Sequence, residues 1–590
     1  MNWQKNLADR LIIGLGGLFL FFPLLYPLPH KGLWIRGISI AAPDSLPRII
    51  KVIEDLNITD VYVQMVVGGS SYYNSKILPR SEYLARHSNQ DYSPADSLLG
   101  YCKKRNIRFH AWINALTVWS FYKKPDSLNH IFYKKPDWFL RDVFGRSMLD
   151  YSGYQWTDLG LEGLFIQPDN PFVADFLKEI CLEIMEKYKL DGIHFDFFRY
   201  PGIYWGIGDS LKTSIFAGLE AENIRWLSLK RYPKLSLFNR WLVYNFYKFN
   251  KIREENLYHL ARMLYQAIKK NRNILISFAV VADPAWARYQ YAQNWWQWNN
   301  CYDYVISMAY TQDVGLFNDF LDFTYSRRPL TIMGIGLLWK GMEESAICER
   351  SLITQRRGRG FCYFDFASID TMFDIGRLNC DTVICLFKDT TESATLANLF
   401  SESPPQRMVD SGKVFTKMDT DLDFFLFLAS LSLNPEQDLR QLALTREKFL
   451  EYIHNDVCTF EYINNKIFTG LDNLIEPPGR EIIYEFFPYE DNDTVKALEY
   501  AKTKKNLTKK LYIYPVSMAP FVSEVFSSNK GERKILHQRS GIYVFEIKRV
   551  KNGGRKMKAN RVKKENLPIF RYWTIKERFD KFVKEDYGDK

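Results

Sequence analysis

The stretch from Asp191 to Pro201 reads Asp-Gly-Ile-His-Phe-Asp-Phe-Phe-Arg-Tyr-Pro. It follows an amphipathic segment, 170–189, that has the spacing of a helix, and it opens with a turn-forming Asp-Gly pair. Apolar residues then alternate with His194 and Asp196, which is the period of a β-strand. Parallel barrel strands are normally apolar on both faces, so this polar face predicts a carboxylate at the C-terminal mouth of a barrel. The alternative is a buried structural Asp196 that orders a loop through Arg199, and spacing alone does not decide between them.

The composition describes a large globular protein. The chain has 590 residues, enough for two or more domains, and 47% of them are hydrophobic. Aromatic residues make up 16%, an excess that favours stacking against sugar rings or flat ligands. The net charge is +11, and no nucleic-acid-binding motif accompanies it, which argues against a nucleic-acid partner. Much of the positive charge lies near the C-terminus, at Lys551, Arg555, Lys556, Lys558, Arg561, Lys563 and Lys564. We interpret this segment as a solvated extension, and contact with an anionic surface is the alternative.

The N-terminal segment has the pattern of an export signal. Lys5 and Arg10 precede an apolar run from Leu11 to Leu28, and no small-x-small cleavage site follows. A run of about 18 residues is near the minimum that spans a bilayer. We therefore expect residues 1–30 to form an uncleaved signal anchor, with a cleaved signal peptide as the alternative. The basic N-terminal flank predicts a single-pass protein of the cell membrane whose bulk is periplasmic or extracellular.

Eight strand-like segments precede residue 370, and helical patterns separate most of them, as at 45–56, 93–105, 172–188 and 252–270. This alternation predicts a (β/α)₈ barrel over residues 31–395, with its longest loop after the fourth strand. An open doubly wound sheet is the alternative, disfavoured because no Gly-rich loop follows the first strand. The predicted strands are Leu33–Ile40, Asp60–Val66, Ile107–Ile113, Gly192–Asp196, Ile274–Val281, Tyr304–Ala309, Leu330–Ile335 and Gly360–Phe366.

A second, smaller unit follows the barrel. Residues 396–408 contain Ser-Glu-Ser-Pro-Pro and have the composition of a linker. Residues 409–550 then read as an α+β domain, in which 480–487, 511–515 and 541–550 are strands and 494–504 is a helix. We expect this domain to fold alone and to be dispensable for chemistry in the barrel. Residues 551–590 complete the chain as the basic tail, with one helix near 574–584.

Polar side chains follow several of the predicted strands where those strands end. Glycoside hydrolysis commonly needs two carboxyl groups, and Asp196 is the first candidate, with Asp283 and Asp365 as candidate partners. A histidine inside a barrel is more often a core residue, so a structural role remains the alternative for the two histidines among the candidates. The candidate substrate-binding residues are His110, Trp112, Asn114, His194, Arg199, Tyr200, Tyr204, Trp205 and Tyr310.

Other chemistries find little support in the sequence. The eight cysteines are scattered and form no Cys-x-x-Cys pair, which argues against a zinc ribbon or a thioredoxin-type site. No histidine pair has metal-ligand spacing, so we expect no metal and no cofactor. A serine nucleophile would need a Gly-x-Ser-x-Gly elbow, which is absent.

These motifs together resemble those of glycosyl-hydrolase-like family ten, a family of bacterial envelope glycosyl hydrolases. The resemblance covers roughly residues 33–390. It implies a (β/α)₈ barrel that acts on a cell-envelope polysaccharide, with peptidoglycan glycan strands as the leading substrate, and it places the acidic residue of the family's fourth strand at Asp196. The matching segments are Trp34-Ile35-Arg36, Val61-Tyr62-Val63-Gln64, Tyr73-Asn74-Ser75 with Pro79, His110-Ala111-Trp112-Ile113-Asn114, Pro168-Asp169-Asn170-Pro171, Tyr188, Asp191 to Asp196, Arg199-Tyr200-Pro201, Arg253-Glu254-Glu255-Asn256, Trp298 and Met308-x-Tyr310.

The chain departs from the family pattern in two places. Gly68-Gly69-Ser70 stands where many members have Arg-Gly-Asp, and Phe197 stands where many have a second Asp after the first. Compared with the chitinase-like Asp-Gly-x-Asp-x-Asp-x-Glu pattern, His194 and Phe198 replace the second Asp and the Glu. The alternative function is therefore an inactive, glycan-binding or chaperone-like envelope scaffold.

The C-terminal domain more faintly resembles a parvulin-type prolyl isomerase. The resemblance covers roughly residues 410–550, through 519–526, Gly531-Glu532 and 540–547. The histidine that such isomerases carry near their first strand is replaced here by 482–485, which read Ile-Ile-Tyr-Glu. The resemblance thus implies a binding or scaffolding unit for an envelope protein partner rather than an active isomerase.

Overall fold

The computed structural model describes residues 30–120, 123–142, 146–203, 205–206, 237–328, 330–337, 344–357, 360–374, 471–489, 494–515, 522–563 and 566–586. The predicted signal anchor, the predicted linker and the first part of the C-terminal domain lie outside these residues. Within the described part of the chain, no helix has both the length and the apolar character needed to cross a membrane.

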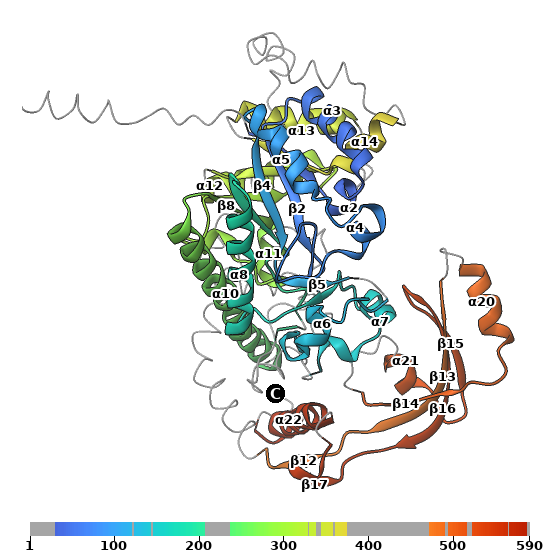
Figure 1. Ribbon diagram of the computed structural model, residues 1–590. Helices are drawn as coiled ribbons and strands as arrows, with labels where there is room; N and C mark the ends of the chain where they lie inside the picture. The colour runs from blue at the N-terminus through green and yellow to red at the C-terminus, as the bar shows by residue number, and fades with distance from the viewer. Residues whose placement is uncertain are drawn as a thin grey trace, which may run out of the picture.

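Eight parallel strands form a closed barrel in the N-terminal part of the described chain (Figure 1). The first strand pairs with both the second and the last, which closes the sheet. All eight predicted strands are present, so the (β/α)₈ fold is confirmed. The barrel strands are β1 (Lys31–Ile35), β2 (Asp60–Val67), β4 (Arg108–Asn114), β7 (Gly192–Asp196), β8 (Leu275–Val281), β9 (Tyr304–Met308), β10 (Ile332–Gly336) and β11 (Phe361–Phe364).

Amphipathic helices cover the outside of the barrel (Figure 1). In α3, for example, Ile49, Val52 and Ile53 are buried, which is the spacing of one helix face. The 17-residue helix α8 begins at a proline and is capped by Asn170, whose side chain accepts the Phe172 N–H at 3.0 Å. These helices are α3 (Leu46–Asp55), α5 (Pro94–Lys104), α8 (Pro171–Lys187), α10 (Leu237–Asn271), α11 (Pro284–Tyr289), α12 (Val314–Arg327), α13 (Glu344–Arg356) and α14 (Phe366–Asp374).

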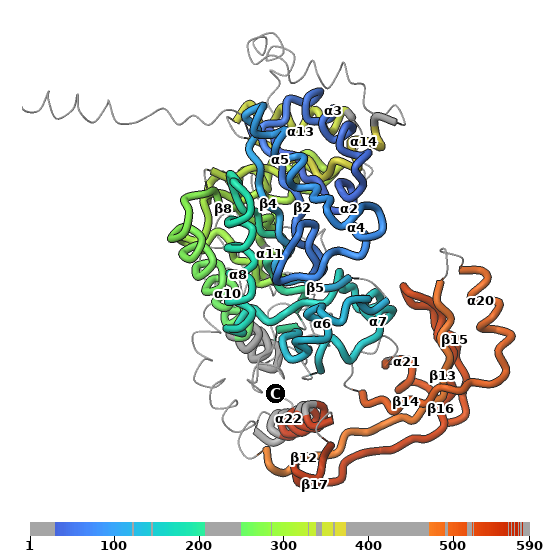
Figure 2. Tube along the Cα trace, in the orientation of Figure 1, coloured from blue at the N-terminus to red at the C-terminus, as the bar shows by residue number. Residues whose placement is uncertain are grey.

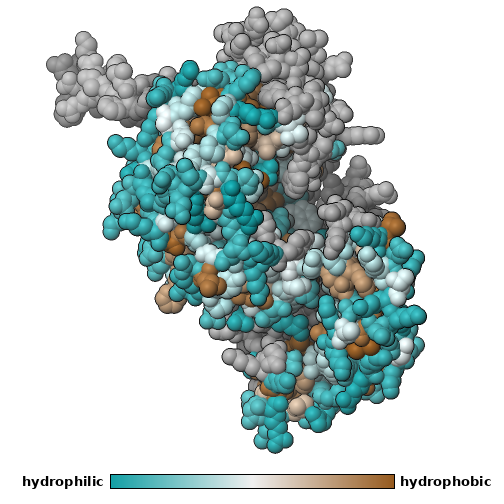
Figure 3. All heavy atoms as spheres, turned by 45° about the vertical axis from the view of Figure 1, so that its right-hand side comes forward, coloured by the Kyte–Doolittle hydropathy of each residue, from teal (hydrophilic) through white to brown (hydrophobic). Residues whose placement is uncertain are grey.

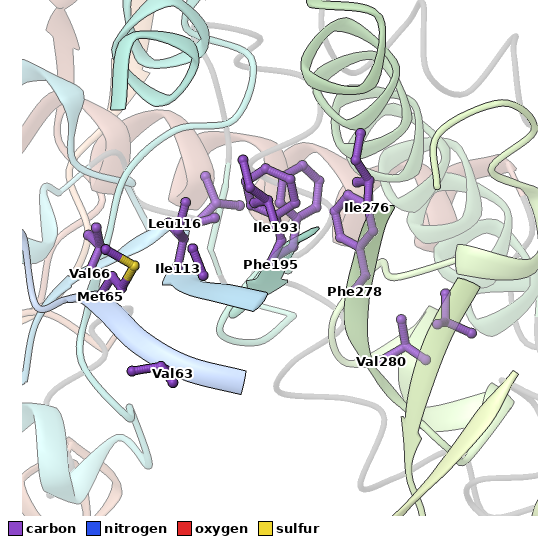
Figure 4. Packing of buried hydrophobic residues seen from close by; sticks show 14 of the residues in the cluster. Val63, Met65, Val66, Ile113, Leu116, Ile193, Phe195, Ile276, Phe278 and Val280 are labelled. Carbon is purple, nitrogen blue, oxygen red and sulfur yellow. The ribbon is translucent and has the colours of Figure 1, made fainter. Parts of the chain in front are cut away.

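The alternation along each strand sorts its side chains between the helices and the barrel interior. Figure 4 shows Ile193 and Phe195 of β7 packed beside Ile113 of β4 and Phe278 of β8 in the layer beneath the helices. The residues between them point inward, where a separate apolar cluster includes Trp34, Tyr62, Trp112, Ile306 and Cys362. His194 and Asp196 therefore share the inner face of the barrel.

An insertion, residues 115–170, separates β4 from α8. Its two short strands, β5 (Thr117–Trp119) and β6 (Leu164–Phe165), pair antiparallel and bracket the helices α6 (Ile131–Lys134) and α7 (Gly153–Asp158). Because β5 follows the end of β4, the insertion lies at the C-terminal end of the barrel strands; Figure 2 traces it in cyan, next to the orange C-terminal domain. The sequence placed the longest loop after β7 instead, and most of that segment lies outside the described residues.

The C-terminal domain contains a four-stranded antiparallel sheet in the order β14 (Lys509–Ile513), β13 (Gly479–Pro488), β16 (Gly541–Lys551), β15 (Arg533–His537). The helix α20 (Thr494–Thr503) packs its Ala497 and Ala501 on one face, and α21 (Val522–Ser527) packs Val525 on the other. Three strands and one helix were predicted here and are present, whereas β15 was missed. The resemblance to a prolyl isomerase stays a prediction.

The basic segment after residue 550 is not an extended tail. Lys556–Lys558 form β17, which pairs with β12 (Asn473–Ile475), and Leu567–Asp586 form the helix α22. Apolar side chains hold the segment in place, because Leu474, Ile569 and Ile575 are fully buried. Basic residues of this segment thus lie on a folded strand and helix. The face in Figure 3 is mostly hydrophilic, with hydrophobic residues in small groups.

Candidate active site

Asp196 ends β7 at the C-terminal mouth of the barrel and is partly buried. Its Oδ1 accepts the N–H of Phe197 at 2.6 Å, and its backbone carbonyl accepts the N–H of Ala115 at 2.9 Å. Burial raises the pKa of Asp196 to about 6, against the opposing effects of the Phe197 N–H and the charge of Arg199. The carboxyl group can therefore hold or release a proton near neutral pH, as a general acid must.

The backbone turns sharply at Phe197, directly after this carboxyl group. Phe197 has φ of +51°, in the left-handed region that aromatic residues rarely adopt. Such a conformation costs about 1–3 kcal/mol and is found most often at functional sites. It is also a conformation that Asp or Asn adopts more readily than Phe.

Asn114 lies beside Asp196, because the two residues are register partners on the adjacent strands β4 and β7. The Asn114 side-chain oxygen accepts the Gln64 amide at 3.3 Å, and the Gln64 oxygen accepts the N–H of Gly37 at 3.1 Å. A chain of hydrogen bonds thus runs across the ends of three neighbouring strands and orients Asn114. Gln64 was not among the predicted site residues, although it occupies an inward position of β2.

Trp112 and Tyr310 complete the surroundings of the carboxyl group. The indole N–H of Trp112 favours the ionised form of Asp196, without meeting the geometry of a hydrogen bond. Burial raises the pKa of Tyr310 above its ordinary value, and the negative charges of Asp196 and Asp365 raise it further. The structure therefore brings Trp112, Asn114 and Tyr310 together with Asp196, as the positions of these residues at strand ends predicted.

Arg199 lies next to Asp196 and pairs with a carboxylate that sequence reasoning missed. Arg199 is only 7% exposed. Its guanidinium donates to the Glu162 carboxylate and lies 4.4 Å from the ring centre of Tyr291 and 5.0 Å from that of Phe197. The charge of Glu162 raises the pKa of Asp196, and that of Arg199 lowers it. Glu162 belongs to the insertion, 37 residues from Arg199, so no local pattern could have revealed the pair.

Asp283 and Asp365, the two predicted partners of Asp196, both cap helices. Asp365 accepts the backbone N–H of Ser368 at 3.1 Å and its hydroxyl at 2.8 Å at the start of α14, and it also pairs with Arg36. Asp283 accepts the N–H of Trp286 at 3.0 Å at the start of α11. Both follow barrel strands as predicted, yet their oxygens are engaged in holding the loops after β8 and β11.

His110 and His194 are not placed at the mouth, contrary to the prediction. His194 accepts the Trp34 indole N–H at 3.1 Å through Nε2 and lies 2.9 Å from the Ser277 hydroxyl through Nδ1. His110 lies 3.0 Å from Asp60, towards the opposite end of the barrel. Both histidines are fully buried, and burial lowers the pKa of His194 well below its ordinary value. They are polar core residues whose partners lie inside the barrel.

Tyr200 and Trp205, two of the candidate substrate-binding residues, are also enclosed, and each is only 1% exposed. The Tyr200 hydroxyl accepts the Asn256 amide at 3.3 Å, and the guanidinium of Arg253 lies 4.5 Å from the centre of its ring. These contacts fasten the segment after β7 to α10. Tyr204 lies outside the described residues.

In the described ranges, no three His, Cys, Asp or Glu side chains converge as a metal site would require. The chemistry that the mouth supports is acid–base catalysis by Asp196, framed by the amide of Asn114, the aromatic walls of Trp112 and Tyr310, and the charge pair of Arg199 with Glu162.

Comparison with known proteins agrees with this geometry. The family model described as glycosyl hydrolase-like 10 matches residues 30–335. The glycosyl hydrolase DigH of Escherichia coli K12 is 25% identical over 225 residues, which are 34% of this chain and 48% of the relative. The glycosyl hydrolase YngK of Bacillus subtilis 168 is 25% identical over 175 residues, 28% of this chain and 31% of the relative.

The chain thus spans less than half of the length of these curated relatives. Among solved structures, the glycoside hydrolase domain of PgaB from Bordetella bronchiseptica covers 61% of this chain and 99% of its own, at 13% identity and a TM-score of 0.39. The family match extends over slightly more than half of the present chain and contains β1 through most of β10, including the mouth at Asp196. The protein belongs to the glycosyl hydrolase-like 10 family.

Proposed function

We propose that this protein is a glycoside hydrolase that cleaves a cell-envelope polysaccharide, with the glycan strands of peptidoglycan as the leading substrate. The observation that carries the proposal is the carboxyl group of Asp196, held at the mouth of a closed barrel with its pKa raised to about 6 by burial. Family membership supports the same chemistry. The names of the relatives give the activity but not the substrate.

In the proposed reaction, Asp196 acts as the general acid. Its raised pKa leaves part of the population protonated near neutral pH, so it can deliver a proton to the glycosidic oxygen as the bond breaks. Tyr310, which is partly exposed, would flank the sugar, and Asn114, oriented by Gln64, would bind a hydroxyl group. Trp112 is only 2% exposed and would support Asp196 from inside the barrel. Proton donation by a positioned group contributes roughly 10²–10⁴-fold to such rates.

We further propose that the chain is anchored in the membrane by its N-terminal segment, with the barrel outside the cytoplasm. The support is the basic flank and the apolar run, 11–28, in the sequence, which lie outside the described residues. On fractionation, the full-length chain should be found with the membranes. Protease added to intact cells or spheroplasts should then degrade the bulk of the chain. Recovery of full-length protein in the soluble cytoplasm would contradict this topology.

The activity is tested with the full chain purified in detergent and incubated with isolated peptidoglycan. Mass spectrometry of the soluble products should show glycan fragments cut between sugars. Asp196→Asn should reduce fragment release by about 10²-fold or more, while its circular dichroism spectrum stays unchanged. A wild-type protein that leaves peptidoglycan and other envelope glycans intact would refute the hydrolase.

A second function, an inactive glycan-binding scaffold, is favoured by one observation. Two of the three predicted carboxylates, Asp283 and Asp365, serve as helix caps. Co-sedimentation with insoluble peptidoglycan distinguishes the two functions: a scaffold would bind the glycan without releasing fragments.

A further inference from the structure

Hydrolysis of a glycoside commonly requires a second carboxyl group besides the acid. Asp283 and Asp365 are engaged at the starts of α11 and α14, as described above. Both carboxylates contribute to the fold, since loss of a capping side chain costs about 0.5–2 kcal/mol. Their engagement directs the search for the second carboxyl group to another residue at the mouth.

Glu162 is positioned to fill this place. It stands in the insertion between α7 and β6, at the C-terminal end of the barrel strands, and its side chain is 52% exposed. The next residue, Gly163, permits the turn that presents it, because a Cβ atom there would lie 2.6 Å from the backbone oxygen of Trp119. Glu162 thus reaches Arg199 from a short loop that is fixed by the β5–β6 pair.

Arg199 connects this carboxylate to Asp196. One guanidinium nitrogen, Nη2, donates to Glu162, and the same cation stabilises the ionised form of Asp196. The other nitrogen, Nη1, is buried and has no hydrogen-bond partner among the described residues. A buried donor without a partner is costly, unless a ligand supplies the missing acceptor. A polar group of the substrate would supply the acceptor that this donor lacks.

We infer that Glu162 is the second carboxyl group of the site and acts as the general base, an assignment that rests on the proposed hydrolase activity. In this mechanism a water molecule lies beside Glu162, on the face of the sugar opposite Asp196. The water oxygen attacks the anomeric carbon as the glycosidic bond breaks. The leaving oxygen takes the proton of Asp196, and Glu162 takes a proton from the water, so the reaction consumes one water per bond.

The test compares single variants of the full chain on peptidoglycan. Glu162→Gln keeps an oxygen that can accept from Arg199, so it should fold with an unchanged melting temperature, yet kcat should fall by about 10²-fold or more with little change in KM. Asp175→Asn is the matched control, because Asp175 is an exposed carboxylate on α8 that pairs only with nearby Lys178 among the described ion pairs. This control should retain wild-type kcat.

Azide gives a second readout that a merely structural residue would not produce. In Glu162→Ala, an azide ion can replace the activated water and attack the anomeric carbon, so added azide should restore cleavage and yield a glycosyl azide. Glu162→Gln with wild-type kcat, or with only a shifted pH optimum, would overturn the assignment while leaving the hydrolase in place. A wild type without any cleavage would overturn both.

Discussion

Asp196 is a charge that the fold accommodates at some cost in stability. Its carboxyl group is partly buried, and its pKa rises from an ordinary value near 4 to about 6 in the folded protein. The folded state therefore binds a proton more tightly than the unfolded chain does. The resulting stabilisation is fully present below about pH 4 and is lost as the pH rises through about 6. At neutral pH the ionised carboxylate therefore lowers the stability of the folded protein, a cost that a catalytic role would explain.

Removing this charge should therefore stabilise the protein while it stops the reaction. We expect Asp196→Asn to raise the free energy of unfolding by roughly 1–3 kcal/mol at pH 7.5 and by much less at pH 4. Urea unfolding of the variant and the wild type at both pH values measures this difference. If Asp196→Asn were less stable than the wild type at pH 7.5, the carboxylate would instead be a hydrogen-bond acceptor that stabilises the fold.

The buried histidines predict the opposite response to acid. Burial lowers the pKa of His30 to about 4, and that of His194 also lies well below its ordinary value. A histidine with a depressed pKa contributes stability that is present above about pH 6.5 and is lost as the pH falls, because the unfolded chain takes up the proton first. The melting temperature should therefore fall by roughly 5 °C or more between pH 7 and pH 5.

Substitutions assign this effect to the barrel interior. His194→Gln should lower stability at pH 7.5 but make its fall towards pH 5 shallower, since one buried titrating group is lost. His87, exposed on the surface helix Glu82–His87, provides the control, and His87→Gln should keep the wild-type profile. Equal slopes for wild type and His194→Gln would show that acid destabilises the protein through other groups.

At the scale of elements, the sequence revealed the strands better than the loops. Alternation located β7 because one face of a barrel strand must pack under helices while the other fills the interior. The same rule extended the first strand too far, to Ile40, whereas β1 ends at Ile35 and a short helix, Gly37–Ile40, follows. The N–H of Gly37 bonds to Gln64 there, a contact that no local pattern records.

The residues of the candidate site also fall into two groups, those that the sequence could predict and those that it could not. Trp112, Asn114 and Tyr310 could be predicted because strand ends of a parallel barrel converge on one mouth. The enclosure of Tyr200 and Trp205 could not be predicted, because Arg253 of α10 lies over the ring of Tyr200 and Tyr151 of the insertion contacts the ring of Trp205. Distant tertiary contacts of this kind lie beyond any local pattern.

The Asp-Gly turn before β7 has a packing reason that yields a sharp test. A Cβ atom at Gly192 would lie 2.3 Å from Nδ1 of His110 and 2.8 Å from the backbone oxygen of Leu275. Gly192→Ala should therefore destabilise the barrel by about 1–3 kcal/mol, as overpacking of a core usually does. Chemical denaturation monitored by tryptophan fluorescence measures the change.

Gly100 supplies the matched control for this substitution. It lies within α5, and a Cβ atom there would meet nothing within 4 Å. Gly100→Ala should stabilise the protein by about 0.5–1 kcal/mol, because alanine favours a helix more than glycine does. If both alanine variants changed stability in the same direction, the clash at His110 would not be the cause.

At the scale of the whole molecule, the C-terminal domain touches the insertion that carries Glu162. The Asp158 carboxylate, at the end of α7, accepts the backbone N–H and the hydroxyl of Ser540, each at 2.9 Å. Tyr154 of the same helix packs against Phe486 of β13 at a ring-centre distance of 5.1 Å. This junction lies only a few residues before Glu162. The expectation that the barrel works independently of this domain stays a prediction, and this junction is the place to test it.

Loss of the junction should lower activity without unfolding the barrel. If the C-terminal domain holds α7, then Asp158→Ala frees the loop that presents Glu162 to Arg199, and kcat should fall several-fold while the barrel still unfolds in a cooperative transition. Ser540→Ala removes the hydroxyl bond from the other side and should have a smaller effect, because its backbone N–H still reaches Asp158.

In a double-mutant cycle the two substitutions should couple by about 0.5–3 kcal/mol in unfolding free energy, as residues in direct contact do. Asp175→Asn, which removes an exposed carboxylate of α8 that pairs with Lys178, should leave both readouts unchanged. Wild-type kcat in Asp158→Ala would show that the C-terminal domain contributes nothing to the site and that the two units act independently.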